Sequence, residues 1–382
     1  MRCRNLAGWC VVGMLALSPA LAADEPDEQV TTAKLAPATP HRLYVSDFAF
    51  QHVVDGRLYV IDGDALKVRG TIGTGFSGEM ALAPDRAELY VATTYYSRLS
   101  RGERADVIDI YDLATLAYKG EIVIPPKHAP ASPYRGLVRT SADGRLLFVQ
   151  NATPASSVTV VDLKTRKFVA EVPTPGCWII LPSQSVSSHF STLCGDGTVL
   201  TVTLDDEGKA KTMKRSARFF NPDEDPLFVH AENIGDRYFF VSFKGRIYTA
   251  NLGGEEATFE EPWSLLGPSD ARQGWRPGGY QVLALHEGSG RIFVAMHPKG
   301  REGSHKDPAK EIWAFDLAAK RRVSRVPGNN AIAIAVSRND QPLLYAIDGV
   351  KMALVVYDAA GKLVLKRRME NVGEVVTLVE VQ

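Results

Sequence analysis

The amino-acid sequence predicts an all-β fold, a seven-bladed β-propeller whose ring is closed by the C-terminal strand completing the first blade. Three observations support this prediction. Short apolar strands and polar turns recur about every 40 to 50 residues from position 42 onward. No long segment has helical periodicity. The last strand-like segment, EVVTLVEV, follows the final repeat unit and has no partner within it.

Each repeat unit contains four predicted strands. A first apolar strand leads through a short turn to a second strand, as in APDRAELYV and SADGRLLFV. A third and a fourth strand follow, joined by a charged turn, as in VTVVDLKTRKFVAEV. Alternating apolar residues bounded by Gly, Asp and Asn are typical of strands in hairpins. Units begin near residues 42, 79, 134, 177, 226, 280 and 331, and eight blades are the alternative count.

The first unit lacks a leading strand. RLYVSDFAF resembles a second strand, and GRLYVID and KVRGTI supply the third and fourth. We therefore expect residues 375–381 to form the innermost strand of the first blade, which would join the two ends of the chain and leave no open ring.

Long connections between second and third strands are predicted on one face of the ring. They are SDFAFQHVVDG, TTYYSRLSRGERAD, QNATPASS and HPKGREGSHKDPAKE, whereas the first-to-second turns are short throughout. In repeat architectures, the face that carries the insertions often binds. Phe48, Phe50, Tyr95 and Tyr96 in these loops are candidates for a pocket or a protein interface, with local packing on the rim as the alternative.

The N-terminus predicts export. A basic segment, MRCRN, precedes the apolar run LAGWCVVGMLAL and an A-x-A site, so residues 1–22 are predicted to be a cleaved signal peptide. The apolar run is too short for a permanent membrane anchor, although a tethered N-terminus is the alternative. Residues 23–40, acidic and rich in Pro and Ala, are predicted to be flexible, and residues 41–382 form the propeller domain.

Composition argues against several classes of partner and site. The 44 basic and 44 acidic residues give no net charge, so we do not expect the chain to bind nucleic acid or an anionic membrane. The sequence has no G-x-S-x-G elbow, P-loop or H-E-x-x-H. His297 and His305 alone are too few for a metal site. Four aspartates near third-strand ends are predicted to form turns: Asp109, Asp112, Asp162 and Asp316.

Cys177 and Cys194 remain after the signal peptide is removed. In an exported protein a disulfide between them is the favoured interpretation, and a free thiol pair or metal ligation is the alternative. The spacing does not fit a C-x-x-C metal or redox motif.

Four long stretches carry a family resemblance. TTYYSRLSRGERADVIDIYD, GCWIILP with CGDGTVLTV, PWSLL with WRPGGYQVLALH, and HPKGREGSHKDPAKEIWAFD resemble the heavy chain of aromatic amine dehydrogenase and, more distantly, of methylamine dehydrogenase. The resemblance covers essentially the whole mature chain. It implies a periplasmic seven-bladed propeller that pairs with a disulfide-rich light chain, two heavy and two light subunits together.

The resemblance also implies an activity that this chain does not perform alone. The light chain carries tryptophan tryptophylquinone, so no cofactor, catalytic residue or metal is expected here. A primary amine, in this subfamily an aromatic one, condenses with the quinone, loses a proton to a light-chain carboxylate, and leaves as aldehyde and ammonia. Electrons pass to a blue-copper protein such as azurin or amicyanin.

Individual residues acquire expectations from this resemblance. Phe50, or Phe48 if the register differs, is expected to line the substrate channel, with Tyr95, Tyr96 and Leu99 nearby at the light-chain interface. Cys177 and Cys194 match the family's heavy-chain disulfide. Two alternatives remain, a stand-alone periplasmic propeller enzyme such as a lactonase-like hydrolase, and a non-enzymatic binding protein.

Overall fold

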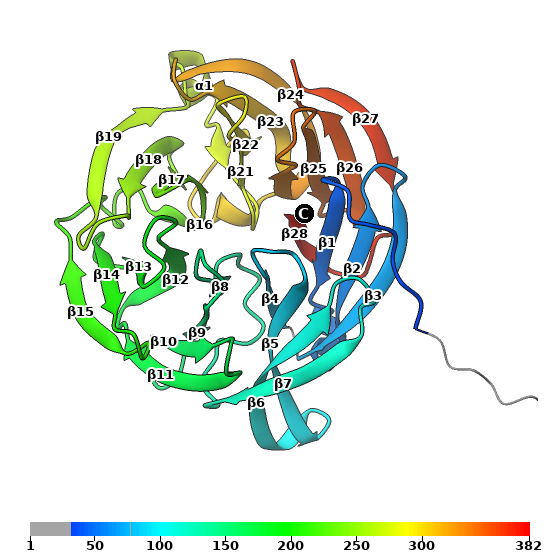
Figure 1. Cartoon of the computed structure of the whole chain (residues 1–382). Helices are drawn as coiled ribbons and strands as arrows, with labels where there is room; N and C mark the ends of the chain where they lie inside the picture. The colour runs from blue at the N-terminus through cyan, green and yellow to red at the C-terminus, as the bar shows by residue number, and fades with distance from the viewer. Residues whose placement is uncertain (1–31, 77) are drawn as a thin grey trace, which may run out of the picture. The chain divides into compact units, whose positions relative to one another are not determined.

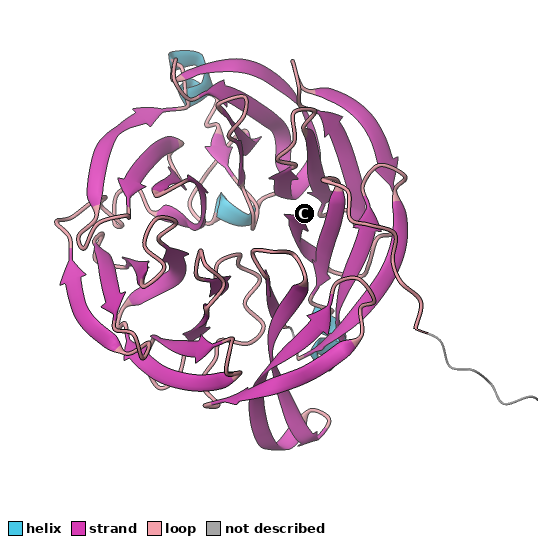
Figure 2. Ribbon diagram, in the orientation of Figure 1, coloured by secondary structure: helices cyan, strands magenta, loops and turns pink. Residues whose placement is uncertain are grey.

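The computed structural model describes residues 32–76 and 78–382, and Lys34–Gln382 form one compact unit. The sheets of this unit lie around a common axis (Figure 1). The all-β part of the prediction is confirmed, because the described helices are only α1 (Pro268–Arg272) and the short 3-10 helices η1 (Phe50–Asp55) and η2 (Ser304–Lys306) (Figure 2). The predicted signal peptide and residues 23–31 lie outside the described residues.

Five of the described sheets have four antiparallel strands each. The first contains β28 (Val376–Val381), β1 (Arg42–Asp47), β2 (Gly56–Asp62) and β3 (Lys67–Gly75). The second contains β4 (Glu79–Leu82), β5 (Glu88–Arg98), β6 (Arg101–Asp112) and β7 (Tyr118–Ile124). The third contains β8 (Val138–Thr140), β9 (Leu146–Asn151), β10 (Ser157–Asp162) and β11 (Lys167–Pro173). The fourth contains β12 (Cys177–Pro182), β13 (His189–Cys194), β14 (Val199–Leu204) and β15 (Ala210–Arg215). The fifth contains β16 (Leu227–Ile234), β17 (Arg237–Ser242), β18 (Arg246–Asn251) and β19 (Thr258–Ser264).

The remaining strands form one eight-stranded sheet, and this corrects the predicted count of seven separate blades. Its strands are β20 (Arg276–Pro277), β21 (Leu283–His286), β22 (Arg291–His297), β23 (Ala309–Asp316), β24 (Arg321–Val336), β25 (Leu343–Asp348), β26 (Ala353–Asp358) and β27 (Val364–Met369). The structure is therefore a propeller arrangement of five four-stranded blades and one continuous larger sheet.

The long strand β24 explains why the sheet does not divide. The predicted boundary near residue 331 falls inside this 16-residue strand. Residues Pro327–Asn330 form a bulge rather than a strand-ending turn, with Asn329 and Asn330 at φ of 51° and 56°. Ala331 pairs with Ala309 of β23 on one side and with Asp348 of β25 on the other. The strand pairing thus continues through the bulge, and β24 pairs with both β23 and β25.

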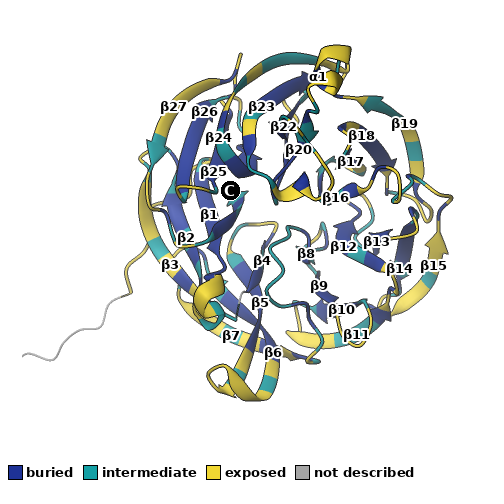
Figure 3. Cartoon of the chain, turned by 180° about the vertical axis from the view of Figure 1, so that it is seen from behind, coloured by how far each residue is buried: buried dark blue, intermediate teal, exposed yellow. Residues whose placement is uncertain are grey.

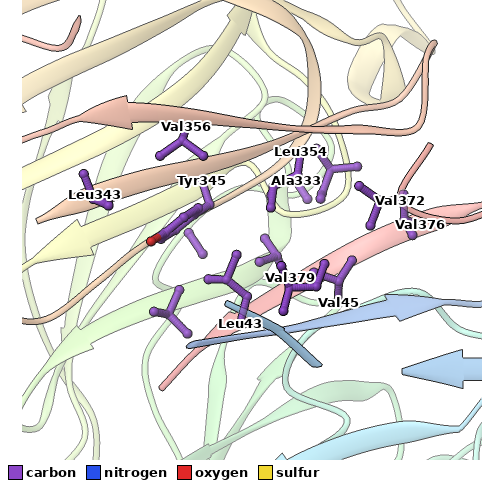
Figure 4. Packing of buried hydrophobic residues seen from close by; sticks show 14 of the residues in the cluster. Leu43, Val45, Ala333, Leu343, Tyr345, Leu354, Val356, Val372, Val376 and Val379 are labelled. Atoms are coloured by element: carbon purple, nitrogen blue, oxygen red, sulfur yellow. The ribbon is translucent and has the colours of Figure 1, made fainter. Parts of the chain in front are cut away.

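The C-terminal strand β28 completes the first sheet, as predicted for this part of the ring. It pairs antiparallel with β1, placing Val379 opposite Val45 and Val381 opposite Leu43. These valines pack into an apolar cluster with residues of β24, β25 and β26 (Figure 4). The two ends of the described unit are therefore held in one core, and this burial stabilises the closure.

Burial follows the position of each strand in its sheet. Middle strands such as β9 and β13 are buried at every residue, because neighbouring sheets cover both of their faces. Rim strands such as β15 and β27 are mostly exposed and rich in Lys and Arg (Figure 3). Such charged outer strands protect the sheet edges from pairing with other chains.

Candidate functional site

The predicted disulfide is present in the fourth sheet. Cys177 and Cys194 are directly opposite each other on β12 and β13, and their Sγ atoms are 2.03 Å apart. Both residues are buried in an apolar cluster. The bond therefore joins two strands of one sheet and leaves neither thiol free for metal ligation.

The first candidate loop presents one phenylalanine and buries another. Ala49 adopts a left-handed conformation with φ of 42°, which turns the chain between the two rings. Phe48 is 1% exposed, whereas Phe50 is 41% exposed at the start of η1. The rings are stacked, with centroids 5.9 Å apart and an interplanar angle of 16°. Phe50 is thus available to a ligand or partner, and the buried ring of Phe48 packs against it.

A buried carboxylate anchors this loop to the closing strand. Asp47 accepts hydrogen bonds from the backbone N–H groups of Glu374 at 2.7 Å and Val375 at 2.9 Å. It also accepts one from Ala49 N–H at 3.1 Å. Since Asp47 ends β1 and Val375 precedes β28, the position of Phe50 depends on the closure of the ring.

The second candidate loop is a β-hairpin, which corrects the expectation of a connecting loop. Strands β5 and β6 remain paired through Tyr96 and Arg104 to a turn at Leu99 and Ser100. The residues TTYY have high β-propensity, so the ladder continues beyond the body of the sheet. The hairpin extends outward from the ring in Figure 1, and its tip is exposed in Figure 3.

The hairpin carries the other three candidate residues. Tyr95 is 40% exposed, and its hydroxyl donates a hydrogen bond to Asp109 Oδ2 at 2.6 Å. The Tyr96 ring packs edge-on against Phe76, with centroids 5.8 Å apart. Leu99 is 75% exposed at the tip. The prediction of a turn-forming role is therefore wrong for Asp109, although Asp112, Asp162 and Asp316 do accept turn N–H groups.

The two groups of aromatic residues flank the end of one strand. Helix η1 contacts β3, and a Cβ added at Gly75, the last residue of β3, would meet Thr93 and Tyr95. Among the described residues, however, the rings form two separate pairs rather than one cluster. The structure brings the candidates to one side of the first two sheets without joining them into a closed pocket.

A buried ionic cluster lies at the base of the hairpin, and the sequence analysis missed it. His128 lies between Asp106 and Glu79, with Nδ1 3.1 Å from Asp106 Oδ2 and Nε2 3.3 Å from Glu79 Oε2. All three side chains are at least 97% buried. Arg104 donates from Nε and Nη2 to Asp106, both at 2.7 Å. Because these residues come from separate segments, no local motif could have identified the cluster.

The cluster holds its members in defined charge states. Burial alone would lower the pKa of His128, but hydrogen bonds and charges from Asp106 and Glu79 outweigh it and raise the pKa to about 9. Burial likewise opposes ionisation of Asp106, yet hydrogen bonds from His128 and Arg104 lower its pKa to about 2. Burial raises the pKa of Glu79. The protonated imidazole of His128 therefore forms ion pairs that join β4, β6 and the connection that follows β7.

The connection of residues 298–308, between β22 and β23, places its short helix η2 near the middle of the ring (Figure 2). Ser304 is fully buried, and the His305 carbonyl accepts a hydrogen bond from Gly279 N–H at 2.9 Å. The segment lines an open pocket of about 470 Å³ together with Tyr134, Phe228 and Tyr280. The long connection HPKGREGSHKDPAKE therefore forms one wall of this pocket.

The part of the chain that the structure describes contains neither a metal-binding cluster nor a membrane-spanning helix. No three His, Cys, Asp or Glu side chains there are arranged to hold a metal ion. No described helix has the length and apolarity needed to cross a membrane.

Two neighbouring tryptophans do not fit a quinone site. The rings of Trp275 and Trp313 lie 5.0 Å apart, but the residues are only 5% and 0% exposed. The guanidinium of Arg325 lies over both rings, with its Cζ 5.0 Å and 5.1 Å from the centroids. An amine could not reach either ring, so the pair belongs to the packing of the large sheet.

The fold and the loop face together define a propeller-type scaffold that displays aromatic residues and a pocket on one side. The family model for the methylamine dehydrogenase heavy chain (MADH) matches residues 39–381. The chain therefore belongs to the methylamine dehydrogenase heavy chain family.

Curated relatives agree with this assignment. The chain is 29% identical over 371 residues to the methylamine dehydrogenase heavy chain of Methylophilus methylotrophus, covering 93% of this chain and 90% of the relative. It is 28% identical over 335 residues to that of Methylobacillus flagellatus, covering 87% and 82%.

Solved structures with low sequence identity share the fold alone. A functionally unknown protein from Desulfotomaculum acetoxidans aligns with a TM-score of 0.62 and 13% identity, covering 89% of this chain and 98% of that one. A putative 6-phosphogluconolactonase from Bacteroides fragilis aligns with a TM-score of 0.61 and 10% identity, covering 90% and 99%.

Proposed function

We propose that this chain is the heavy subunit of a periplasmic quinoprotein dehydrogenase that oxidises primary aromatic amines to aldehyde and ammonia. The observation that carries the proposal is the family match over residues 39–381. The proposed assembly contains two heavy and two light chains and passes electrons to a blue-copper protein such as azurin or amicyanin. The heavy chain scaffolds the light chain and shapes the path of the substrate.

The cofactor of this proposal, tryptophan tryptophylquinone, belongs to the light chain and supplies the oxidising carbonyl that reacts with the amine. Within this chain the role is positioning and exclusion of water. The exposed Phe50 ring, backed by the buried Phe48 ring, offers an apolar wall on the loop face. Stacking against such a wall favours an aromatic ring over a methyl group by about 1 kcal/mol or more.

The hairpin of β5 and β6 supports the proposed contact with the light chain. An exposed leucine at a hairpin tip has no role in the core, and contact with an apolar depression of a partner would remove its side chain from water. The partly exposed rings of Tyr95 and Tyr96 are of the residue type that interfaces favour. We assign Leu99, Tyr95 and Tyr96 to this interface.

Purification from the native source tests the assembly. We expect a small subunit to copurify, and a visible quinone band to bleach when tyramine is added. A lone, colourless protein obtained together with the products of its neighbouring genes would contradict the heavy-subunit proposal. It would return the function to a lactonase-like hydrolase or a binding protein.

A second experiment tests the channel assignment. In the assembled enzyme, Phe50→Ala should lower kcat/KM for tyramine by about tenfold, equivalent to about 1.4 kcal/mol, with less effect on methylamine. Phe168→Ala is a matched control, because Phe168 is 40% exposed on the rim strand β11. The same ratio of tyramine to methylamine activity in Phe50→Ala and wild type would refute the assignment.

A further inference from the structure

The face opposite the loop face has its own opening at the axis of the ring. A pocket of about 620 Å³ is lined there by residues of the short first-to-second turns, including Arg86, Ser141, Gln184 and Arg338. These turns follow β4, β8, β12 and β24, on the side away from the connection of residues 298–308. The volume is within the range of small-molecule pockets in proteins.

One arginine in the lining of this pocket is already paired with two carboxylates. Arg135 donates to Glu380 from Nε at 2.7 Å and from Nη2 at 2.9 Å, and it forms a second ion pair with Glu232. All three residues line the pocket. One guanidinium therefore binds both carboxylates, and Glu232 Oε1 also lies 3.3 Å from His230 Nε2, so neither carboxylate is free to pair with another arginine.

Three more arginines line the same pocket and lack such partners. Within the described residues, the side chains of Arg86, Arg139 and Arg338 make no hydrogen bond or ion pair. Arg139 and Arg86 are partly buried, and Arg338 is exposed at the rim of the pocket. Surface arginines often lack partners, but three that converge on one concave site create a positive field that attracts anions.

The charges around these arginines leave positive charge in excess. Burial lowers the pKa of Arg139, and the neighbouring Arg135 lowers it further. Burial also lowers the pKa of Arg86, with Arg338 acting in the same direction and Glu380 opposing it. Glu232 and Glu380 are already bound by Arg135. The other carboxylate in the lining, that of the exposed Glu287, sets one negative charge against three guanidinium groups.

We propose that this pocket binds a small multivalent oxyanion, of which inorganic phosphate is the simplest example, between Arg86, Arg139 and Arg338. A guanidinium presents its donors as a planar fork that matches two oxygens of one anion. Three such forks need an anion with several oxygens, which a halide lacks. The site is separate from the proposed amine oxidation and does not depend on it.

Calorimetric titration of the mature protein, in whichever assembly it purifies, tests the site with sodium phosphate at constant ionic strength. Citrate is titrated in parallel to distinguish phosphate from carboxylate groups, and chloride serves as the control for screening. We expect saturable binding of phosphate or citrate, and binding at least tenfold weaker in Arg139→Gln and Arg338→Gln. Arg237→Gln is the matched control, because Arg237 pairs with Glu260 on the fifth sheet and should not affect binding.

Two results would overturn the proposal. One is a response to phosphate and citrate no larger than the response to chloride. The other is unchanged affinity in Arg338→Gln, which decides the matter even if Arg139→Gln fails to fold, since the exposed Arg338 supports no core packing. Amine oxidation is not a readout here, so neither result bears on the proposed dehydrogenase function.

Discussion

The buried imidazole of His128 should make the stability of this protein depend on pH in a defined window. Its pKa is raised from 6.5 to about 9 in the folded chain. A raised pKa means that protonation favours folding, so the stabilisation is complete below about pH 6.5 and is lost as the pH rises through about 9. A shift of this size corresponds to about 3 kcal/mol, at about 1.4 kcal/mol for each pH unit.

The perturbation is His128→Gln, and the assay is urea unfolding followed by intrinsic fluorescence between about pH 6 and about pH 9.5. Wild type should lose about 3 kcal/mol more than the variant across this range. At the acidic end the variant should be less stable by a similar amount, because Asp106 and Glu79 lose the cation that lies between them.

His52→Gln is the matched control for this experiment. His52 lies 2.8 Å from Glu374, but their side chains are 43% and 50% exposed, so the pair should contribute little to stability. Groups that titrate in all three proteins cancel when slopes are compared. If His128→Gln and wild type lose stability in parallel from neutral to alkaline pH, the assignment of a charged imidazole is wrong.

Two further predictions concern covalent and polar links in the fold. Replacing both Cys177 and Cys194 by Ser should lower the free energy of unfolding by about 3 kcal/mol, because the bond closes a loop between residues 17 apart, and should abolish any effect of reductant on unfolding by urea. A reductant effect that persists in the double variant would contradict this. Asp47→Ala should cost about 2 kcal/mol in thermal or urea unfolding, because it leaves the part-buried N–H groups of Glu374 and Val375 without their acceptor. Stability within about 0.5 kcal/mol of wild type would show that these bonds are not needed.

The periodic strands were predictable because each carries its own local signal. The repeat boundaries expected near residues 79, 177 and 226 coincide with the starts of β4, β12 and β16. The closing strand was also predictable, since the first unit lacked one strand and the chain ended with one in excess. The disulfide followed from two cysteines in a chain that was expected to be exported.

Three features could not be found in this way. The bulge at Pro327–Asn330 has the composition of a turn, and only the pairing of β24 with both neighbours shows that the strand continues. The hairpin was expected to be a loop because TTYYSRLSRGERAD is long compared with the short first-to-second turns, yet the ladder of β5 and β6 persists. The cluster of Glu79, Asp106 and His128 depends on contacts between distant segments, which periodicity does not reveal.

The pairing of β1 with β28 has a consequence for the order in which the protein is made. Tyr44 bonds Gln382 across a separation of 338 residues. Closing a flexible loop of that length costs about 3 kcal/mol more entropy than closing a ten-residue hairpin. While the chain folds, β1 has no inner neighbour until β28 is in place, so its edge is open to wrong partners for much of the time. Ring closure is thus a late event, and chaperones that prevent aggregation would act on the unpaired edge of β1.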